Sequence, residues 1–408
     1  MNKRIVVFSF LIGLGIVLFS SEWGYSEQSL APYIKLGVDY YHLKQYTKAR
    51  KAFEEAVKLD PGDFEAHYNL ARTLIELKDY ESATKELMAC LELRPGSSGI
   101  HLLLGNLFSY QGLPEKAMSE YEKEIAIDPR SGIAWHNLGQ ILYWQGAYEK
   151  AVEKLEKAID VNPGLERGYT SLGMGYFELG HWDKALEALQ KAVTQDPEDV
   201  DAHLYLGRVH LEEKNYEKAE KELEAVIGLD PRNSHAHAYL ANIYMEKGRY
   251  FNAESELEAA VQIEPDEPIF LYNLAHTYVE LQKYKQAIEE FQQVLRLEPV
   301  FEDTYFRLGS IYYKQGKIEQ AIDCYEKEIQ HHPDNPDAYF NLGLIYLEQK
   351  EYGLSEQNLE MVIQISPHDA EAHEVLGDLY AEKGMYSQAV EEHEKAIQIR
   401  SRGSQAPE

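Results

Sequence analysis

The chain has 408 residues, and its 40 lysines and arginines against 69 aspartates and glutamates give a formal net charge of −29 at pH 7. Hydrophobic residues make up 44% of it, which excludes wholesale disorder. The acidic excess argues against a nucleic-acid binder, because such a protein needs clustered Lys and Arg. Only two cysteines occur, Cys90 and Cys324, so a disulfide framework and a cysteine-based zinc site are excluded.

The first element along the chain is an apolar stretch. Two basic residues precede an apolar run of 15 residues from Ile5 to Phe19, which is typical of a secretory signal peptide. Two following serines bring the run to the lower edge of the roughly 17 to 25 residues of a spanning helix. We predict that residues 1–26 are either a signal peptide cleaved before Glu27 or an uncleaved membrane anchor. Both alternatives export residues 27–408, to the periplasm or the extracellular space or to the outer side of the inner membrane, and membrane contact is then confined to residues 5–21.

Behind this stretch, one period fills the chain. Ten of the fifteen prolines follow one another at intervals of 34 residues, from Pro61 to Pro367. Placing each at position 32 of a repeat gives eleven repeats over residues 30–403 and a polar tail at 404–408. The repeats start at residues 30, 64, 98, 132, 166, 200, 234, 268, 302, 336 and 370.

Several positions of the period keep one kind of residue. Position 7 is always leucine, position 8 is always Gly or Ala, and position 20 is alanine in ten repeats. Two apolar stripes at helical spacing predict two amphipathic helices in each repeat. A turn such as Gln145-Gly146-Ala147 separates them, since glycine allows the conformation that ends a helix. The small residues predict close approach of the two helices, and the proline predicts the end of the second one.

This order of Leu-Gly, Tyr, Ala and Pro within 34 residues resembles the tetratricopeptide repeat, over residues 30–403. The resemblance implies an all-α fold, a right-handed α-solenoid superhelix of tandem helix-turn-helix repeats whose first helices line a concave groove. It also implies that positions 2, 5, 6, 9, 12 and 13 face that groove. One helix pair cannot bury its apolar face alone, so neighbours must stack. We expect repeat 11 to end the stack with a polar second helix, because His393 and three glutamates lie there.

Acidic residues are the first candidates for binding on the groove. Position 13 is glutamate in seven of the eleven repeats, and four of these are consecutive. One interpretation is a track that attracts a basic peptide or protein segment. The other is that glutamate is a soluble helix former on a solvated face. The consecutive four are Glu178, Glu212, Glu246 and Glu280.

Aromatic residues at position 5, with Tyr313 at position 12, are the second candidates. Exposed rings on a concave surface are typical anchors for a peptide or a partner helix, and half-buried packing is the alternative. The rings at position 5 are Tyr272, Phe306 and Phe340, and a further cluster comprises Tyr110, Tyr143 and Trp144.

Asparagines at positions 6 and 9 are the third candidates, because an amide donates and accepts and so suits an extended peptide backbone. Asn242, Asn273 and Arg307 fall on three of the five positions of the family's carboxylate clamp. Ala238 and Asp303 replace its two lysines, and the negative charge of Asp303 argues against a carboxylate ligand. The other asparagines in these columns are Asn69, Asn106, Asn137 and Asn341.

Other residue types point to packing rather than chemistry. Five histidines occupy position 4, one per repeat, where other repeats carry a bulky residue, so we expect no metal site. Cys90 and Cys324 are expected to be reduced, mostly buried thiols. The columns contain no catalytic set and imply no cofactor. The five histidines are His67, His101, His203, His237 and His373.

The sequence therefore predicts a non-catalytic scaffold for protein–protein interaction. It would bind a peptide or protein segment in its groove, in cell-envelope assembly or secretion. A self-assembling array, in which the groove of one copy receives the amino-terminal repeat of another, is the alternative. An enzyme or a carrier of small ligands would need a catalytic set outside the repeat columns.

Overall fold

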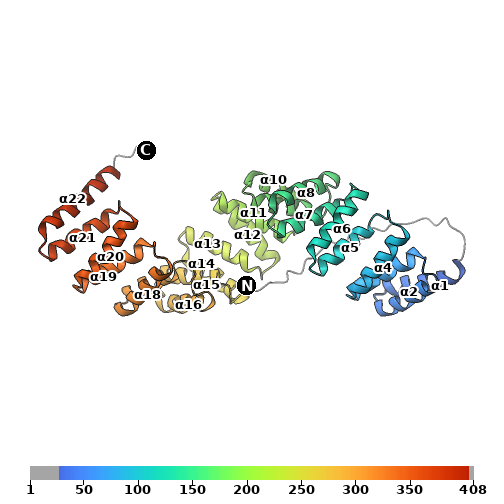
Figure 1. The fold of residues 1–408 in the computed structure, drawn as a ribbon, viewed down its shortest axis with the longest axis horizontal. Coiled ribbons are helices and arrows are strands. Elements are labelled where there is room, and N and C mark those ends of the chain that lie inside the picture. Colours follow the sequence, from blue (N-terminus) through green and yellow to red (C-terminus); the bar gives the residue numbers. More distant parts are fainter. Residues whose placement is uncertain (1–26, 404–408) are drawn as a thin grey trace. The chain divides into compact units, whose positions relative to one another are not determined.

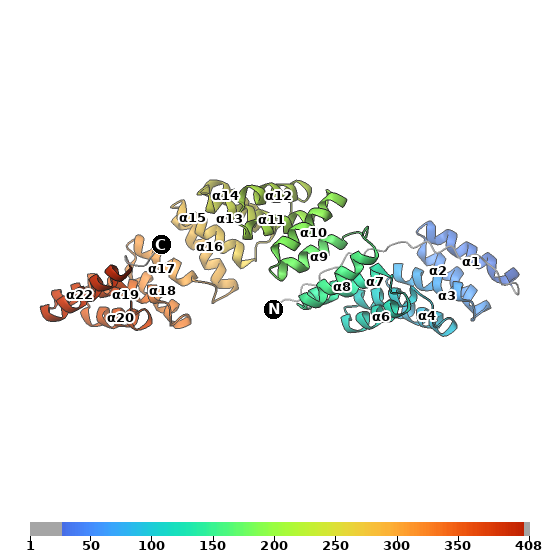
Figure 2. The same ribbon diagram turned by 90° about the horizontal axis from the view of Figure 1, so that it is seen from above.

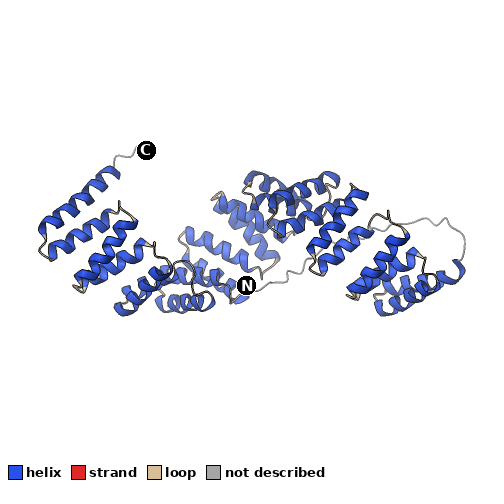
Figure 3. Cartoon of the chain, in the orientation of Figure 1, coloured by secondary structure: helices blue, strands red, loops and turns tan. Residues whose placement is uncertain are grey.

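The computed structural model describes residues 27–403, which form 22 α-helices joined by turns (Figures 1 and 3). The predicted all-α architecture of paired helices is confirmed. The predicted signal peptide or anchor, residues 1–26, lies outside the described residues. Among residues 27–403, no helix combines the length and the apolar character needed to cross a membrane.

Each repeat contributes a first and a second helix. The first helices are α1 (Glu27–His42), α3 (Phe64–Glu76), α5 (Ile100–Tyr110), α7 (Gly132–Trp144), α9 (Gly168–Glu178), α11 (Val200–Glu212), α13 (Ser234–Glu246), α15 (Pro268–Glu280), α17 (Thr304–Lys314), α19 (Pro336–Glu348) and α21 (Ala370–Glu382). The second helices are α2 (Tyr46–Leu59), α4 (Tyr80–Leu93), α6 (Pro114–Ile127), α8 (Tyr148–Val161), α10 (Trp182–Gln195), α12 (Tyr216–Leu229), α14 (Tyr250–Ile263), α16 (Tyr284–Leu297), α18 (Ile318–His331), α20 (Tyr352–Ile365) and α22 (Tyr386–Gly403). The chain divides within α12 into two compact units, Met1–Glu222 and Leu223–Glu408, which are described separately.

Five first helices, α3, α11, α13, α19 and α21, start where an Asp or Asn at position 34 of the preceding repeat supplies a cap. The side chain of Asp199, for example, accepts a hydrogen bond of 3.0 Å from the backbone N–H of Ala202. Such a bond satisfies one of the free N–H groups of the first turn. Position 34 is serine, leucine or phenylalanine before α5, α9 and α17, and these three helices have 11 residues, whereas most other first helices have 13. All three short helices lack an Asp or Asn cap, although α7 and α15 reach 13 residues without a side-chain cap.

Two buried glutamates take over the capping role in two of these three repeats. Glu124, exposed to 2%, accepts from the backbone N–H of Gly99 at 2.8 Å, just before α5. Glu328, exposed to 1%, accepts from the N–H of Phe306 at 3.2 Å in the first turn of α17. Both lie at position 27, which is a small or β-branched residue in the other repeats. A carboxylate from the second helix thus replaces the missing cap of the first.

The two ends of each second helix are set by backbone geometry. All eleven residues at position 15, between the paired helices, have positive φ, from 55° at Lys44 and Lys214 to 76° at Gly146. This left-handed conformation ends the first helix, and six of the eleven residues are glycine. Before the prolines, residues such as Asp60 (φ −140°, ψ 96°) are extended, as proline requires of its predecessor.

Packing within and between repeats follows the small residues. A Cβ atom added to Gly173 would lie 2.5 Å from Cγ of Leu189 on the paired helix, so the predicted close approach at position 8 is confirmed. Between repeats, Val152 of α8 and Ile159 of the same helix meet Gly175 and Gly168 of α9. Positions 21 and 28 of one repeat therefore contact positions 10 and 3 of the next. Within each unit, successive pairs stack in this way (Figure 2).

Candidate functional site: the first-helix face

Positions 2, 5, 6, 9, 12 and 13 of successive first helices form one surface in each unit, here called the first-helix face. Position 6 of one repeat contacts position 9 of the repeat before it: the amide of Asn137 donates to Oδ1 of Asn106 at 2.9 Å. Position 12 contacts position 13 of the next repeat: Tyr313 donates to Glu348 at 2.7 Å. The predicted groove positions therefore do lie side by side. Two further tyrosine–glutamate contacts of this kind join Tyr41 to Glu76 and Tyr143 to Glu178.

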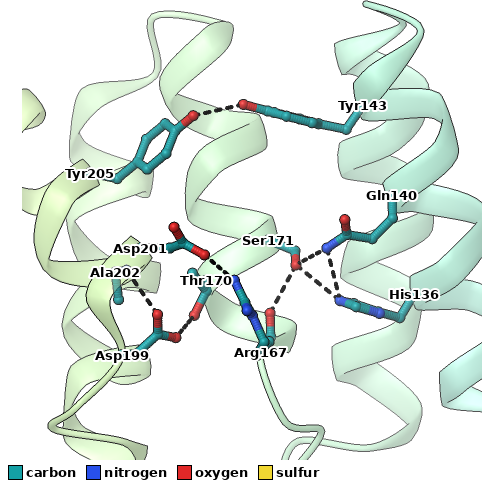
Figure 4. A network of polar contacts seen from close by, with 10 residues as sticks. All are labelled: His136, Gln140, Tyr143, Arg167, Thr170, Ser171, Asp199, Asp201, Ala202 and Tyr205. Atoms are coloured by element: carbon teal, nitrogen blue, oxygen red, sulfur yellow. Dashed lines mark hydrogen bonds and ion pairs between the residues drawn. The ribbon is translucent and has the colours of Figure 1, made fainter. Parts of the chain in front are cut away.

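In unit 1, aromatic side chains span this face in repeats 4 to 6. The hydroxyl of Tyr143 on α7 lies 2.9 Å from the hydroxyl of Tyr205 on α11, so the pair reaches across the intervening α9 (Figure 4). Phe177 of α9 packs against this pair, with its ring 5.4 Å from that of Tyr205 in an edge-to-face contact. Burial raises the pKa of both tyrosines, so both hydroxyls are neutral at physiological pH.

A polar network fills the face beside this tyrosine pair (Figure 4). Nε2 of His136 lies 2.9 Å from Oγ of Ser171, which donates to the backbone carbonyl of Arg167 at 2.9 Å. Burial lowers the pKa of His136 to about 4, so the ring is neutral at pH 7. Arg167 in turn forms an ion pair with Asp201. In this region the polar groups are satisfied by one another.

The predicted acidic residues differ in their surroundings. In unit 1, Glu178 is half-buried, accepts from Tyr143 at 3.4 Å and lies 3.8 Å from Arg208. Glu212 of the same unit is exposed. In unit 2, Glu246 and Glu280 are exposed as well. No hydrogen bond or ion pair joins the carboxylate of Glu212, Glu246 or Glu280 to another described residue.

Two asparagines of unit 2 also have side-chain amides without a hydrogen-bond partner among the described residues. Asn242 and Asn273 are half-buried and have the same register, position 9 and then position 6, as the bonded pair Asn106 and Asn137. Their side-chain amides nevertheless form no hydrogen bond with any described residue. Both amides are therefore available to a ligand on the first-helix face of repeats 7 and 8.

The predicted aromatic residues of unit 2 are half-buried and packed. Tyr272 donates to Oδ1 of Asp303 at 2.5 Å, and its ring lies 5.6 Å from that of Phe291. Burial, together with the hydrogen bond to Asp303, raises the pKa of Tyr272 to about 12. Phe306 packs 5.7 Å from the ring of Tyr325. These rings thus have structural partners within the repeats.

The remaining candidates of unit 2 have partners as well. Phe340 packs against the core of repeats 10 and 11. The hydrogen bond to Glu348 raises the pKa of Tyr313 to about 12. Arg307 forms an ion pair of 2.9 Å with Asp303. The positive charge of Arg307 is therefore already neutralised by the carboxylate that replaces a clamp lysine.

The second aromatic cluster, in repeats 3 and 4, borders an apolar cavity of about 250 Å³. Trp144 is 50% exposed, while Tyr143 is buried against it, with ring centroids 5.3 Å apart. Tyr110 stacks instead on Tyr80 at 6.4 Å. The cavity is lined by Ser109, Gly112, Pro114, Ile141, Trp144 and Gln145.

The histidines at position 4 have a role that sequence reasoning missed. In all five, Nδ1 lies 2.6 Å from the carboxylate of a glutamate at position 23, on the paired helix. Histidine at position 4 and glutamate at position 23 occur together in these five repeats, and this internal correlation was the available signal. No group of three metal-ligating side chains is present among the described residues. The pairs are His67–Glu86, His101–Glu120, His203–Glu222, His237–Glu256 and His373–Glu392.

Both cysteines are buried and neither forms a disulfide, as predicted. Burial raises the pKa of Cys90 to about 12 and that of Cys324 to about 11. The reactive thiolate is therefore scarce at neutral pH.

Comparison with protein families gives repeat models along most of the chain. Models of the tetratricopeptide repeat match residues 40–107, 336–369 and 370–402, and a model of the TPR repeat matches residues 309–350. The model of the C-terminal domain of cilia and flagella-associated protein 70 matches residues 111–311. No curated protein matches the chain.

Among solved structures, the chain is similar to several repeat proteins. YrrB, described as a TPR protein with an unusual peptide-binding site, is 24% identical over 45% of this chain and 95% of its own, with a TM-score of 0.40. The Cut9–Hcn1 hetero-tetramer of the APC/C is 14% identical over 91% and 94%, with a TM-score of 0.43. The human IFIT1 dimer with m7Gppp-AAAA is 17% identical over 92% and 91%, with a TM-score of 0.45.

The family is thus given by the repeat models together with the unbroken series of helix pairs in the described residues. The chain is a member of the tetratricopeptide-repeat family.

Proposed function

We propose that the protein is a non-catalytic scaffold that binds an extended, basic protein segment on the first-helix face of repeats 7 and 8. The observation that carries the proposal is the open pair Asn242 and Asn273. Elsewhere the same register is closed by a hydrogen bond, as in Asn106 and Asn137 at 2.9 Å. Two open amides at this spacing suit the main-chain N–H and C=O groups of an extended segment.

The charge of the segment follows from the neighbouring carboxylates. Glu246 lies one helical turn beyond Asn242 on α13, and Glu280 lies at the same position of α15. Both are exposed, and neither carboxylate forms a hydrogen bond or an ion pair with another described residue. At the same position of other repeats, the carboxylates of Glu76, Glu178 and Glu348 each accept a hydrogen bond from a tyrosine hydroxyl. Lysine or arginine side chains of a bound segment would pair with the two free carboxylates and speed its association.

Binding of labelled peptides to the purified chain, followed by fluorescence anisotropy, tests this function. We expect twelve-residue peptides rich in Lys and Arg to bind, and matched acidic or uncharged peptides to bind at least tenfold more weakly. A Glu246→Gln/Glu280→Gln variant should lose about tenfold in affinity for the basic peptides and most of the salt dependence.

The matched control removes two exposed glutamates from second helices, Glu319→Gln/Glu360→Gln, with the same change in net charge. It should bind as the unchanged chain does. An Asn242→Ala/Asn273→Ala variant should weaken all bound peptides alike, because it removes contacts with the main chain. Equal affinity for basic and acidic peptides would contradict the proposed partner.

The proposal also includes the cellular location of the protein, which is outside the cytoplasm. The basic and apolar character of the first 21 residues supports export, and with it a role in cell-envelope assembly or secretion. A phosphatase reporter that is active only outside the cytoplasm, fused after residue 408, tests the location. We expect activity that is lost when residues 5–21 are deleted, and an inactive fusion to the full chain would contradict export.

A further inference from the structure

The outer face of repeat 11 exposes an apolar stripe, against the expectation of a polar end. On α22, Tyr386 is 72% exposed, Val390 57% and Ile397 65%. These residues hold positions 17, 21 and 28. The equivalent residues of the other repeats are buried or half-buried.

The other repeats show what covers this stripe. In repeat 10, Tyr352 and Ile363 at positions 17 and 28 pack against a core that contains Leu376 and Leu379 of α21. In repeat 4, Val152 at position 21 contacts Gly175 of α9. The covering element is thus the first helix of the following repeat.

A hydrogen bond accompanies the apolar contact between the covering helix and the repeat below. In repeats 5, 8 and 10, the tyrosine at position 11 of the covering helix donates to the glutamate at position 25 of the repeat below. In repeat 9 the direction is reversed, and Gln292 at position 25 donates to Tyr312. Tyr176 donates to Glu156 at 2.5 Å, and Tyr278 donates to Glu258 at 3.0 Å. In repeat 11 the residue at position 25 is Glu394, which is exposed and has no partner among the described residues.

One pattern that fits these contacts recurs among the covering helices. Four of the ten covering helices, α13, α17, α19 and α21, carry a small residue at position 3, leucine at 7, an aliphatic residue at 10 and tyrosine at 11, as in Ala338, Leu342, Ile345 and Tyr346 of α19. The first three are 0%, 3% and 1% exposed, which shows how completely the contact excludes water. The spacing i, i+4, i+7 and i+8 places all four on one side of a helix.

The first helix of a second copy does not fit this stripe. In α1, position 10 is Asp39, which would lie against Val390 and bury an unpaired carboxylate. The net charge of −29 adds repulsion between copies.

We infer that the outer face of repeat 11 is a docking site for an amphipathic helix of a partner protein. The helix carries a small residue, leucine, an aliphatic residue and tyrosine at i, i+4, i+7 and i+8. Its apolar side chains cover Tyr386, Val390 and Ile397, and its tyrosine hydroxyl donates to Glu394. This site is separate from the first-helix face and does not depend on what binds there.

A synthetic peptide of residues 335–350, which contains α19, serves as the probe. A staple between residues 337 and 341, which lie on the first-helix face and away from the contacting side, keeps it helical, as circular dichroism verifies. Fluorescence anisotropy then measures its binding to the full chain and to the chain begun at residue 27. We expect saturable binding to both.

Variants of the stripe decide where the probe binds. Val390→Glu and Ile397→Glu should each weaken binding at least tenfold, whereas Leu43→Glu, at a side chain 65% exposed elsewhere, should not. Glu394→Ala and a probe with Tyr346→Phe should each cost several-fold. Their combination should cost no more than either alone, because both remove the same hydrogen bond.

Four results would overturn the inference. Two are the absence of saturable binding by the helical probe and binding that Val390→Glu leaves unchanged. A third is probe binding to the chain begun at residue 27 but not to the full chain, which makes the amino-terminal segment the occupant. The fourth is concentration-dependent association of the unchanged chain in sedimentation, abolished by Val390→Glu, which makes a second copy the occupant.

Discussion

Nδ1 of His67 lies 2.6 Å from the carboxylate of Glu86, and Nε2 of the same ring lies 3.0 Å from the backbone carbonyl of Pro61. Both neighbours are hydrogen-bond acceptors, so each ring nitrogen of His67 lies against an acceptor. The ring is 7% exposed and joins the first and second helices of its repeat to the preceding turn. Five repeats contain this histidine–glutamate contact.

Removal of one partner from such a pair should destabilise unit 1. Hydrogen bonds from Lys123 and His101 lower the pKa of Glu120 and outweigh the opposite effect of its burial. A lowered carboxyl pKa contributes stability above the unfolded value near 4, and this contribution is lost as pH falls through the folded value. Glu120→Gln should therefore lower the midpoint of urea unfolding at pH 7. Near pH 3 the same variant should differ less from the unchanged chain, and an equal difference at both pH values would contradict the ion pair.

His136 should produce a pH dependence in a different window. Its folded pKa of about 4 is below the ordinary value of 6.5, because burial disfavours the charged ring. Between these two values the unfolded chain binds more protons, so the stability of unit 1 falls as pH falls through this window. The loss at pH 5 is roughly 2 kcal/mol. His136→Gln should remove this slope between pH 6.5 and 4 while a similar side chain still bonds Ser171, and a persisting slope would assign it to another group.

The sequence alone predicts the helices because the same residues recur at the same positions. It does not predict which of the repeated polar side chains lack a hydrogen-bond partner. Asn106 and Asn242 share position 9, and asparagine follows each in the same register. Asn106 is held by Tyr121, whose hydroxyl donates to its Oδ1 at 2.8 Å from the second helix. The corresponding residue of repeat 7 is Leu257, which has no hydroxyl to orient Asn242. The difference depends on a side chain of another column, so a single column does not reveal it.

The histidines and buried glutamates show the same limitation. When only position 4 is compared across the repeats, histidine is one bulky residue among several. Its glutamate partner becomes evident only when position 23 is compared at the same time. Glu124 and Glu328 break a column of smaller residues in two repeats that also lack an Asp or Asn cap. In both cases the signal is a correlation between two columns, and its meaning depends on which helices face each other.

The turn at position 15 gives a prediction for stability. Gln282 has φ of 57°, in a region that costs a side-chain-bearing residue about 1–2 kcal/mol. Six other repeats carry glycine here, so Gln282→Gly should stabilise unit 2 by about 0.5–1 kcal/mol in urea unfolding. Gln349→Gly is the matched control: its φ of −80° is ordinary, and glycine there should destabilise. Stabilisation by both changes would show that the φ of Gln282 is not the cause.

The capping role of Glu124 leads to a prediction of rescue. Its carboxylate accepts from the backbone N–H of Gly99 at 2.8 Å and from the hydroxyl of Ser98 at 3.1 Å while being 2% exposed. Glu124→Ala leaves these donors unsatisfied in a buried place, which should cost unit 1 about 2–3 kcal/mol in urea unfolding. Most other repeats have a small or β-branched residue at position 27, and many of these are capped by Asp or Asn at position 34. Ser97→Asp, which supplies that cap at position 34, should therefore recover about 1 kcal/mol in the Glu124→Ala background.

The same Ser97→Asp change in the unaltered chain should recover nothing, because Glu124 already satisfies the start of α5 and a second carboxylate nearby would repel it. Hydrogen exchange of the first amides of α5 gives a local readout of the same cycle. Their protection should fall in Glu124→Ala and return in the double variant. If Ser97→Asp stabilises both backgrounds equally, the two carboxylates act independently, and Glu124 does not substitute for the missing cap.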